Sequence, residues 1–212
     1  REELAPLAAL AIERDMVVVC DEIHADLMLD GRRHMPFGAM FPEAADRTVT
    51  LYSATKSFNI PGLRCGLMHF GSAALQERFN RRIPPLLLGT PAVVGVYATI
   101  AAWEEPEAWL EGLIRLIEGN RDHMLARFAA ELPEVAIGAP EATYLAWADF
   151  KALRLPERPY LYLLDKAKVA GGDGAHFGPG YEEFVRFNVA TSRSILDDKI
   201  DRIVRAVRRN AA

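Results

Sequence analysis

The sequence lacks what several common protein classes require. Only 2 of its 212 residues are cysteines, too few for the disulfide framework of a small secreted domain. No apolar run approaches the roughly 20 residues of a membrane-spanning helix, and an opening of Arg1-Glu2-Glu3 is unlike a signal peptide. The formal net charge of -4 gives no electrostatic footprint for nucleic acid. We therefore expect neither a membrane nor a nucleic acid as partner.

The two cysteines, Cys20 and Cys65, lie in apolar, strand-like runs. Free cysteine is among the most buried residue types, so we expect two buried thiols in a reducing cytoplasm. A disulfide between neighbouring strands is the alternative. Four histidines fall at no metal-ligand spacing with carboxylates or cysteines, and we expect no metal site at His34, His69, His123 and His176.

The composition predicts a packed globular core, because half the residues are hydrophobic and 25% are charged. Apolar periodicity in the first part predicts helices over 2–14, 73–82 and 91–103, and strands over 16–20, 48–52 and 65–70. The continuous β-branched run of 16–20 is typical of a parallel strand buried on both faces. Glycine and proline make 27–45 mostly loop, and 84–90 a turn.

A long amphipathic helix over 107–132, stopped by Pro133, opens the second part. The pattern then predicts strands near 135–137, 143–147 and 184–189, and helices near 160–167 and 195–208. Ser194 and Asp197 have the spacing of a capping box for the last helix.

The stretch 50–64 concentrates the chemistry of the chain. An apolar strand runs into a turn rich in hydroxyl groups, with a single lysine and, after a Pro-Gly pair, one arginine. A strand ending in such a loop puts polar side chains at the carboxyl edge of a sheet, where open α/β folds bind ligands. Hydroxyl groups and a guanidinium suit an oxyanion such as phosphate, and a lysine can act as a nucleophilic amine. The residues concerned are Ser53, Thr55, Lys56, Ser57 and Arg64.

This stretch resembles a known family. Ser53-x-x-Lys56, with Arg64 eight residues after the lysine, is similar to the cofactor-lysine signature of fold-type I pyridoxal-phosphate (PLP) enzymes, the aspartate-aminotransferase superfamily. The run 17–21 resembles that family's strand ending in the aspartate that pairs with the pyridine nitrogen, here Asp21. His24 stands where the family usually has tyrosine, and Asp-Glu-Ile-His-x-Asp-Leu resembles the cystathionine β-lyase-like branch (MalY/PatB type).

The resemblance assigns a role to each matching residue. It implies that Lys56 holds PLP as a Schiff base, that Asp21 keeps the ring nitrogen protonated, and that His24 contacts the ring oxygen. It implies that Ser53 and Arg64 bind the cofactor phosphate, with Thr55 or Ser57 as helpers. Arg186, in Val-Arg-Phe-Asn, resembles the arginine that binds the substrate α-carboxylate. Each residue also has an ordinary structural alternative: a loop lysine, a helix cap, a structural histidine, turn hydroxyls or a surface arginine.

The implied fold class is α/β. Residues 1–108 would be the C-terminal portion of the PLP-binding large domain, with a mainly parallel sheet flanked by helices. Residues 109–212 would be a smaller α+β C-terminal domain. In the resembled family a glycine- and serine-rich phosphate loop and a stacking aromatic residue precede this part, so we expect the chain to be the C-terminal half of an enzyme. The family's sites lie at a dimer interface, which implies a homodimer.

The implied function is that of a PLP-dependent carbon–sulfur β-lyase on cystathionine or cysteine-type amino acids, giving pyruvate, ammonia and a thiol. A PLP-dependent class I/II aminotransferase is the alternative, because the same residues serve both routes. Two distant alternatives are a DExH-type helicase fragment, whose motifs the Asp-Glu-Ile-His and Ser-Ala-Thr segments resemble, and a non-catalytic aminotransferase-like interaction domain.

Overall fold

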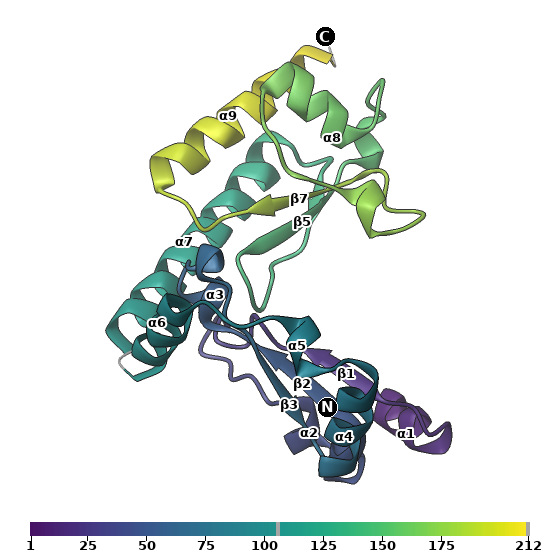
Figure 1. Cartoon of the computed structure of the whole chain (residues 1–212). Helices are drawn as coiled ribbons and strands as arrows, with labels where there is room; N and C mark the ends of the chain where they lie inside the picture. The colour runs from purple at the N-terminus through teal and green to yellow at the C-terminus, as the bar shows by residue number, and fades with distance from the viewer. Residues whose placement is uncertain (105–106, 211–212) are drawn as a thin grey trace. The chain divides into compact units, whose positions relative to one another are not determined.

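The computed structural model describes residues 1–104 and 107–210. The chain forms two compact units, Arg1–Leu110 and Glu111–Ala212 (Figure 1). The division falls inside helix α7 (Glu107–Glu131), just after the predicted boundary at 108, and the identity of the units as the predicted domains stays a prediction. None of the helices in the described ranges has the length and apolarity to cross a bilayer.

The first unit is built on a three-stranded sheet. Its strands are β1 (Val18–Asp21), β2 (Thr48–Tyr52) and β3 (Leu67–Phe70). Their order is β1-β2-β3, with β1 and β2 parallel and β2 and β3 antiparallel. The register pairs Asp21 with Leu51 and Tyr52 with Leu67. The residues that follow β1 and β2 and those that precede β3 therefore lie at the same end of the sheet, the edge formed by the carboxyl ends of β1 and β2.

Short helices surround this sheet. They are α1 (Ala5–Glu13), α2 (Phe37–Met40), α3 (Ala54–Ser57), α4 (Ala73–Arg82), α5 (Pro85–Leu88) and α6 (Val93–Glu104), with 3₁₀ turns at Pro42–Arg47 and Pro61–Leu63. The predicted loop 27–45 thus contains helical turns, because Phe37 and Phe41 are buried and pack with ring centroids 5.0 Å apart. The predicted turn 84–90 contains α5, which ends where Gly89 takes a positive φ of 74°.

The two faces of the sheet are covered differently. On one face Val18 and Cys20 pack against the buried cluster of Ala8, Phe37, Phe41 and Ala44. On the other face Val19 is 63% exposed and lines an open apolar hollow of about 620 Å³. The expectation that 16–20 is buried on both faces is therefore wrong for this chain, because α4 borders the hollow without closing it. The hollow is lined by Val17, Val19, Val49, Leu51, Met68, Phe70, Leu75, Arg78, Phe79, Arg82 and Ile83.

The cysteines also differ from expectation. Cys20 and Cys65 are both free and only half-buried, so the disulfide alternative is wrong and the expected full burial is too strong. Burial raises the pKa of the Cys20 thiol, and the nearby Glu22 carboxylate adds to this effect.

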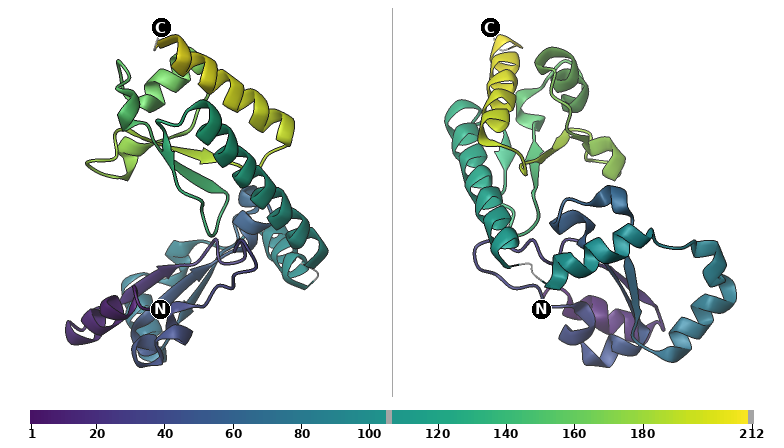
Figure 2. Two further views of the ribbon diagram at one scale, coloured as in Figure 1. Left: turned by 180° about the vertical axis from the view of Figure 1, so that it is seen from behind. Right: turned by 60° about the vertical axis from the view of Figure 1, so that its left-hand side comes forward.

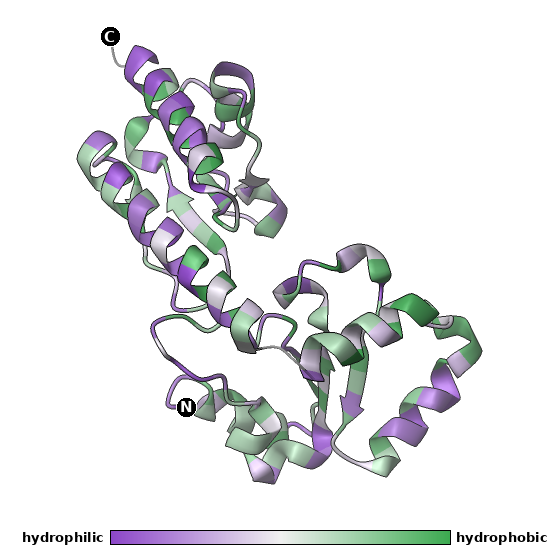
Figure 3. Ribbon diagram, turned by 90° about the vertical axis from the view of Figure 1, so that its left-hand side faces the viewer, coloured by the Kyte–Doolittle hydropathy of each residue, from purple (hydrophilic) through white to green (hydrophobic). Residues whose placement is uncertain are grey.

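The hydropathy colouring marks the leucine-rich turn α5 in green (Figure 3), where Leu86 is 89% exposed.

The second unit has a four-stranded antiparallel sheet of order β4-β5-β7-β6. Its strands are β4 (Ala136–Ile137), β5 (Leu145–Asp149), β6 (Gly172–Asp173) and β7 (Phe184–Asn188). The strand predicted over 143–147 begins only at Leu145, because Thr143 has a φ of 68° and its Oγ1 accepts a hydrogen bond from Leu145 N at 3.0 Å.

Helices α7 and α9 (Arg193–Asn210) lie side by side and parallel against this sheet (Figure 2). Side-chain contacts at matching positions join them: a hydrogen bond between His123 and Asp197 and an ion pair between Arg127 and Asp201. The predicted capping box at Ser194 is wrong. The helix begins at Arg193, Ser192 Oγ accepts from Ile195 N at 3.5 Å, and Asp197 instead pairs with His123.

The helix predicted near 160–167 is confirmed in a different form. It consists of α8 (Pro159–Tyr162) followed by a π-helical turn, Leu163–Ala167. Lys168 ends it in the left-handed conformation, with a φ of 56°.

Candidate functional site

Five of the six predicted site residues come together at one edge of the first sheet. Asp21 is the last residue of β1, and Ser53 directly follows β2. Arg64 precedes the antiparallel strand β3, whose first residue pairs with the last residue of β2. The carboxyl ends of β1 and β2 therefore meet the start of β3, the position at which open α/β sheets bind ligands.

Lys56 is held on the single turn of α3. Ser53 caps this turn: its Oγ accepts a hydrogen bond from Thr55 N at 3.2 Å and donates to the Cys65 carbonyl at 2.6 Å. The cap and the hydrogen bond to the Cys65 carbonyl stabilise the turn. Lys56 on this turn is half-buried. The Ser53 hydroxyl thus already hydrogen-bonds to two backbone groups, and its contact with the cofactor phosphate stays a prediction.

The two predicted helpers differ in access. Thr55 is half-buried, with its Oγ1 at 2.9 Å from Ser53 Oγ. Ser57 is 0% exposed, and within the described residues its Oγ has no hydrogen-bond partner. An accessible hydroxyl is better placed to meet a ligand than one enclosed by the fold, so Thr55 fits the helper role better.

Asp21 ends β1, and His24 lies in the loop that follows. Asp21 is exposed and its Oδ1 accepts from Ile23 N at 3.3 Å. Glu22 N donates to Leu51 O at 2.9 Å, which continues the β1–β2 pairing one residue past Asp21. His24 lies half-buried in the turn that follows. The end of β1 and this loop therefore present a carboxylate and an imidazole beside the end of β2.

Arg64 takes a backbone conformation that is rare for residues other than glycine. Its φ of 47° and ψ of 55° place it in the left-handed region, directly after the 3₁₀ turn Pro61–Leu63. Helix α6 packs against this turn at Gly95, where a Cβ would meet the Leu63 carbonyl oxygen at 2.2 Å. The close approach requires glycine and fixes the backbone from which the Arg64 side chain extends.

We expect Gly95→Ala to displace the Arg64 loop and to destabilise the protein by about 1–3 kcal/mol, as overpacking generally does. Gly112→Ala is the matched control, because Gly112 also lies on a helix and a Cβ there would meet nothing within 4 Å. Helix propensity makes that control neutral or stabilising by up to about 1 kcal/mol. Urea unfolding of both variants measures the difference, and equal effects would contradict the assignment.

Arg186, the sixth predicted residue, lies on β7 in the second unit. Its guanidinium carbon lies 4.7 Å from the centroid of the Phe177 ring. A cation stacked on a ring uses its face, so the in-plane N–H groups keep the fork geometry that suits a carboxylate. Gly172 pairs with Arg186 across the sheet, and a Cβ there would come within 3.4 Å of Arg186 Nε.

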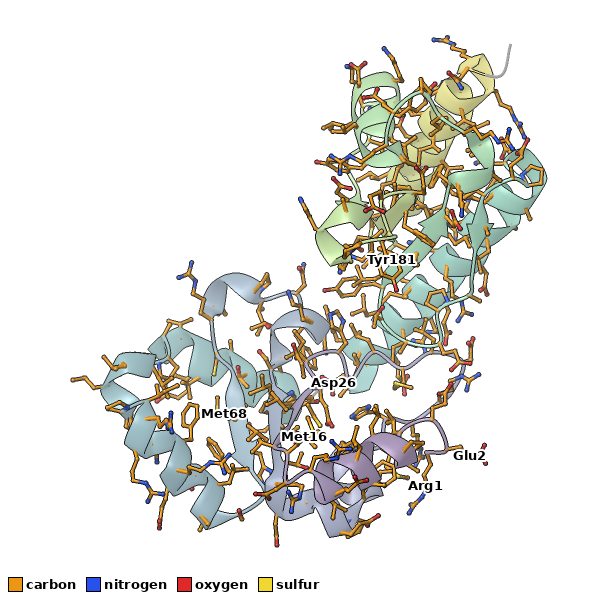
Figure 4. All side chains as sticks on the ribbon, turned by 90° about the vertical axis from the view of Figure 1, so that its right-hand side faces the viewer. Arg1, Glu2, Met16, Asp26, Met68 and Tyr181 are labelled. Carbon is orange, nitrogen blue, oxygen red and sulfur yellow. The ribbon has the colours of Figure 1, made fainter. Side chains whose placement is uncertain are left out.

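Sequence reasoning missed the aromatic residues beside Arg186. Trp147 lies 5.1 Å from Phe177 and 5.9 Å from Tyr181 between ring centroids. Phe177 is 45% exposed and Tyr181 44% exposed, and Figure 4 labels Tyr181 at the surface of its unit. They are far apart in the sequence: Trp147 lies on β5, whereas Phe177 and Tyr181 lie in the segment between β6 and β7, and only the fold brings them together.

Sequence reasoning also missed a side-chain pair in the first unit. The Tyr52 hydroxyl donates a hydrogen bond to Asp26 Oδ1, and the Tyr52 ring stacks on Trp103 with centroids 5.2 Å apart. Burial and then the Asp26 hydrogen bond raise the pKa of Tyr52, so its hydroxyl stays protonated and remains a donor. Figure 4 labels Asp26 among the side chains at this end of the sheet.

The donor set at this edge suits pyridoxal phosphate. An amine, a carboxylate, an imidazole, hydroxyls and a guanidinium match an aldehyde, a ring nitrogen, a ring oxygen and a phosphate. Asp21 ends β1, and Lys56 lies on the capped turn that directly follows the adjacent parallel strand β2. The residues present therefore fit the group.

Comparisons with known proteins agree with this chemistry. The family model for aminotransferase class I and II matches residues 1–206. The chain is 36% identical over 208 residues to cystathionine beta-lyase PatB from Bacillus subtilis, covering 98% of this chain and 54% of that protein. The chain thus spans about half the length of the curated relatives it matches.

Solved structures of PLP-containing proteins are also similar to this chain. The PLP-bound C–S lyase from Staphylococcus hominis superimposes with a TM-score of 0.91 at 30% identity, over 100% of this chain and 55% of that one. Cystalysin from Treponema denticola, which contains a pyridoxal 5'-phosphate cofactor, gives 0.92 at 28% identity, over 99% and 54%. The predicted resemblance and fold class are confirmed, and the chain belongs to the class I and II aminotransferase family of PLP-dependent enzymes.

Proposed function

We propose that the protein carrying this chain is a PLP-dependent carbon–sulfur β-lyase acting on cystathionine or cysteine-type amino acids. The observation that carries the proposal is the common edge of the first sheet, where Asp21, His24, Ser53, Lys56 and Arg64 converge from three strands. The C–S lyases among the similar proteins support this branch over others of the family.

Each residue takes a role that its position permits. The Lys56 amine would hold the cofactor through its aldehyde, and as a free amine it would remove the proton from the substrate Cα. Asp21 holds a proton on the ring nitrogen. His24 contacts the ring oxygen, and Arg64 with Ser53 or Thr55 holds the phosphate. Bound PLP supplies an electron-withdrawing ring that stabilises the negative charge left at Cα.

Arg186 binds the α-carboxylate of the substrate through its in-plane N–H groups. With the carboxylate fixed and the Cα proton on Lys56, the electron pair of the Cα–H bond moves to form a Cα–Cβ double bond. The Cβ–S bond breaks and the sulfur leaves as a thiolate. Hydrolysis of the remaining three-carbon unit gives pyruvate and ammonia. The same residues would also serve transamination, the second candidate, which the family name supports.

The test is to add PLP to the complete gene product that contains this chain and then to supply cystathionine. We expect a visible absorbance band from the lysine-bound cofactor, followed by release of pyruvate and of a thiol that reacts with a thiol reagent in equal amounts. Formation of a new amino acid from an added 2-oxo acid, without thiol, would instead identify an aminotransferase. Uptake of PLP with neither product would leave a non-catalytic binding domain, and no uptake would refute the proposal.

Two further expectations concern the setting of the enzyme. We propose a homodimer, because the resembled family builds its sites at a subunit interface. We also propose a cytoplasmic location, since two free, half-buried thiols suit a reducing compartment. Membership of the PLP family leaves the helicase alternative without support.

A further inference from the structure

We propose that Asp26 and Tyr52 are a positioning pair that sets the loop after Asp21, which carries His24, against the turn carrying Lys56. The inference rests on the proposed function, because it concerns how this edge holds the cofactor. Neither residue is one of the six predicted from the family signature.

The pair joins two segments that each carry site residues. Asp26 lies two residues after His24, and Tyr52 lies directly before Ser53 and the Lys56 turn. The Tyr52 hydroxyl donates to Asp26 Oδ1 across the gap between them. One side-chain hydrogen bond thus connects the loop after β1 to the end of β2.

The loop 22–27 is fixed at its ends by the fold. Glu22 N donates to Leu51 O at 2.9 Å, and Leu27 is 0% exposed. Between these anchors the backbone turns twice, with Ala25 N donating to Glu22 O and Leu27 N donating to His24 O, each at 2.9 Å. Asp26, next to the Leu27 anchor, supplies a side-chain link from this loop to Tyr52, so it helps to set where the backbone that presents His24 lies.

The other end of the pair leads straight to the lysine. Tyr52 is the last residue of β2, and Ser53 after it caps α3 and donates to the Cys65 carbonyl. A shift of the Tyr52 side chain would therefore be passed to the cap and to the Lys56 turn. The pair couples the position of the ring-contacting loop to the position of the amine.

The surroundings of Tyr52 shield this part-buried hydrogen bond from water on one side. Val49 and Leu51 face the open hollow, so the alternation of β2 turns Tyr52 to the opposite face. There Trp103 of α6 stacks on its ring with an interplanar angle of 17°. A hydrogen bond to a carboxylate under such cover is stronger and more directional than one at the surface.

Tyr52→Phe tests the pair, because it removes only the hydroxyl and leaves the ring on Trp103. Tyr160→Phe is the matched control: the same atom is removed from a tyrosine of the second unit that no site role involves. In the complete gene product we expect Tyr52→Phe to weaken PLP binding by roughly tenfold or more. We expect it to change the visible circular dichroism of the bound cofactor even at saturating PLP, and Tyr160→Phe to change neither.

The spectrum at saturation separates positioning from general stability. A merely structural hydroxyl would lower the unfolding temperature and leave the spectrum of the fully loaded protein unchanged. Asp26→Ala should reproduce the Tyr52→Phe spectrum, and the double variant should be no worse than either single one. Asp26→Asn, which keeps an acceptor oxygen, should recover part of the wild-type signal.

The inference is overturned if Tyr52→Phe binds PLP with wild-type affinity and spectrum, or if the effects of Tyr52→Phe and Asp26→Ala multiply in the double variant. Wild-type protein that takes up no PLP would instead refute the proposed function. Amide hydrogen exchange of the cofactor-free protein then still decides on the link. The pair requires faster exchange over 22–27 in Tyr52→Phe, with β5 unchanged, and equal exchange would refute it.

Discussion

Lys56→Ala should abolish the visible absorbance of the bound cofactor and reduce kcat/KM for the lyase reaction by at least about 10²–10⁴-fold. The structure places this amine half-buried on a capped turn at the end of β2. Alanine can neither attach to an aldehyde nor move a proton, so both roles are lost together. Absorbance scans with added PLP and assays of pyruvate release measure the two effects.

Lys168→Ala is a suitable control for this substitution. Lys168 is exposed in the second unit and pairs with Asp165, an exposed ion pair worth about 0–1 kcal/mol. Borohydride reduction followed by peptide mapping adds a direct test, since the pyridoxyl group should be found on Lys56 in wild-type protein. A pyridoxyl adduct on another lysine, or an unchanged absorbance band in Lys56→Ala, would remove Lys56 from the mechanism.

The sequence predicts the site edge better than the surroundings of the strands. The β-branched runs and the turn chemistry around Lys56 are local signals. They predict a parallel strand over 16–20, and β1 does pair in parallel with β2. Exposure of Val19 is different. A continuous apolar run indicates that both faces suit burial, but which face is covered depends on segments far away in the sequence.

Short elements and unusual backbone conformations escaped prediction for physical reasons. Strand β6 has two residues, too few to show any period. Arg64 and Thr143 adopt positive φ without being glycine, so composition gives no hint of the turns they form. Ser192 rather than Ser194 caps α9, because the packing of α9 on α7 decides where the helix begins.

The link between Asp26 and Tyr52 could not be predicted from spacing. The two residues are 26 positions apart, and only the parallel register of β1 and β2 brings them together. The two ends of the link nevertheless flank the strongest motifs of the chain, Asp-Glu-Ile-His and Ser-Ala-Thr-Lys. Local sequence motifs therefore predict the site residues, whereas the contacts that hold these residues in place depend on how distant segments pair in the fold.

Asp21→Asn should lower kcat/KM by about 10–100-fold while PLP remains attached to Lys56. A hydrogen bond between ionised partners contributes about 1.5–3 kcal/mol, and each 1.36 kcal/mol corresponds to a factor of ten. The amide keeps the size of the side chain but cannot hold the proton on the ring nitrogen. Steady-state assays, with borohydride trapping on the same samples, measure both parts of the prediction.

Asp46→Asn makes the same chemical change at a position outside the site, on the 3₁₀ turn Pro42–Arg47, and should leave kcat/KM unchanged. Asp21→Glu keeps the charge and should recover part of the rate if the longer side chain can still reach the ring. Wild-type kinetics in Asp21→Asn would contradict the assigned role. Loss of the Lys56 adduct in Asp21→Asn would show that the carboxylate is needed to bind the cofactor. A residue that acts only on the electrons of the ring would leave the attachment to Lys56 intact.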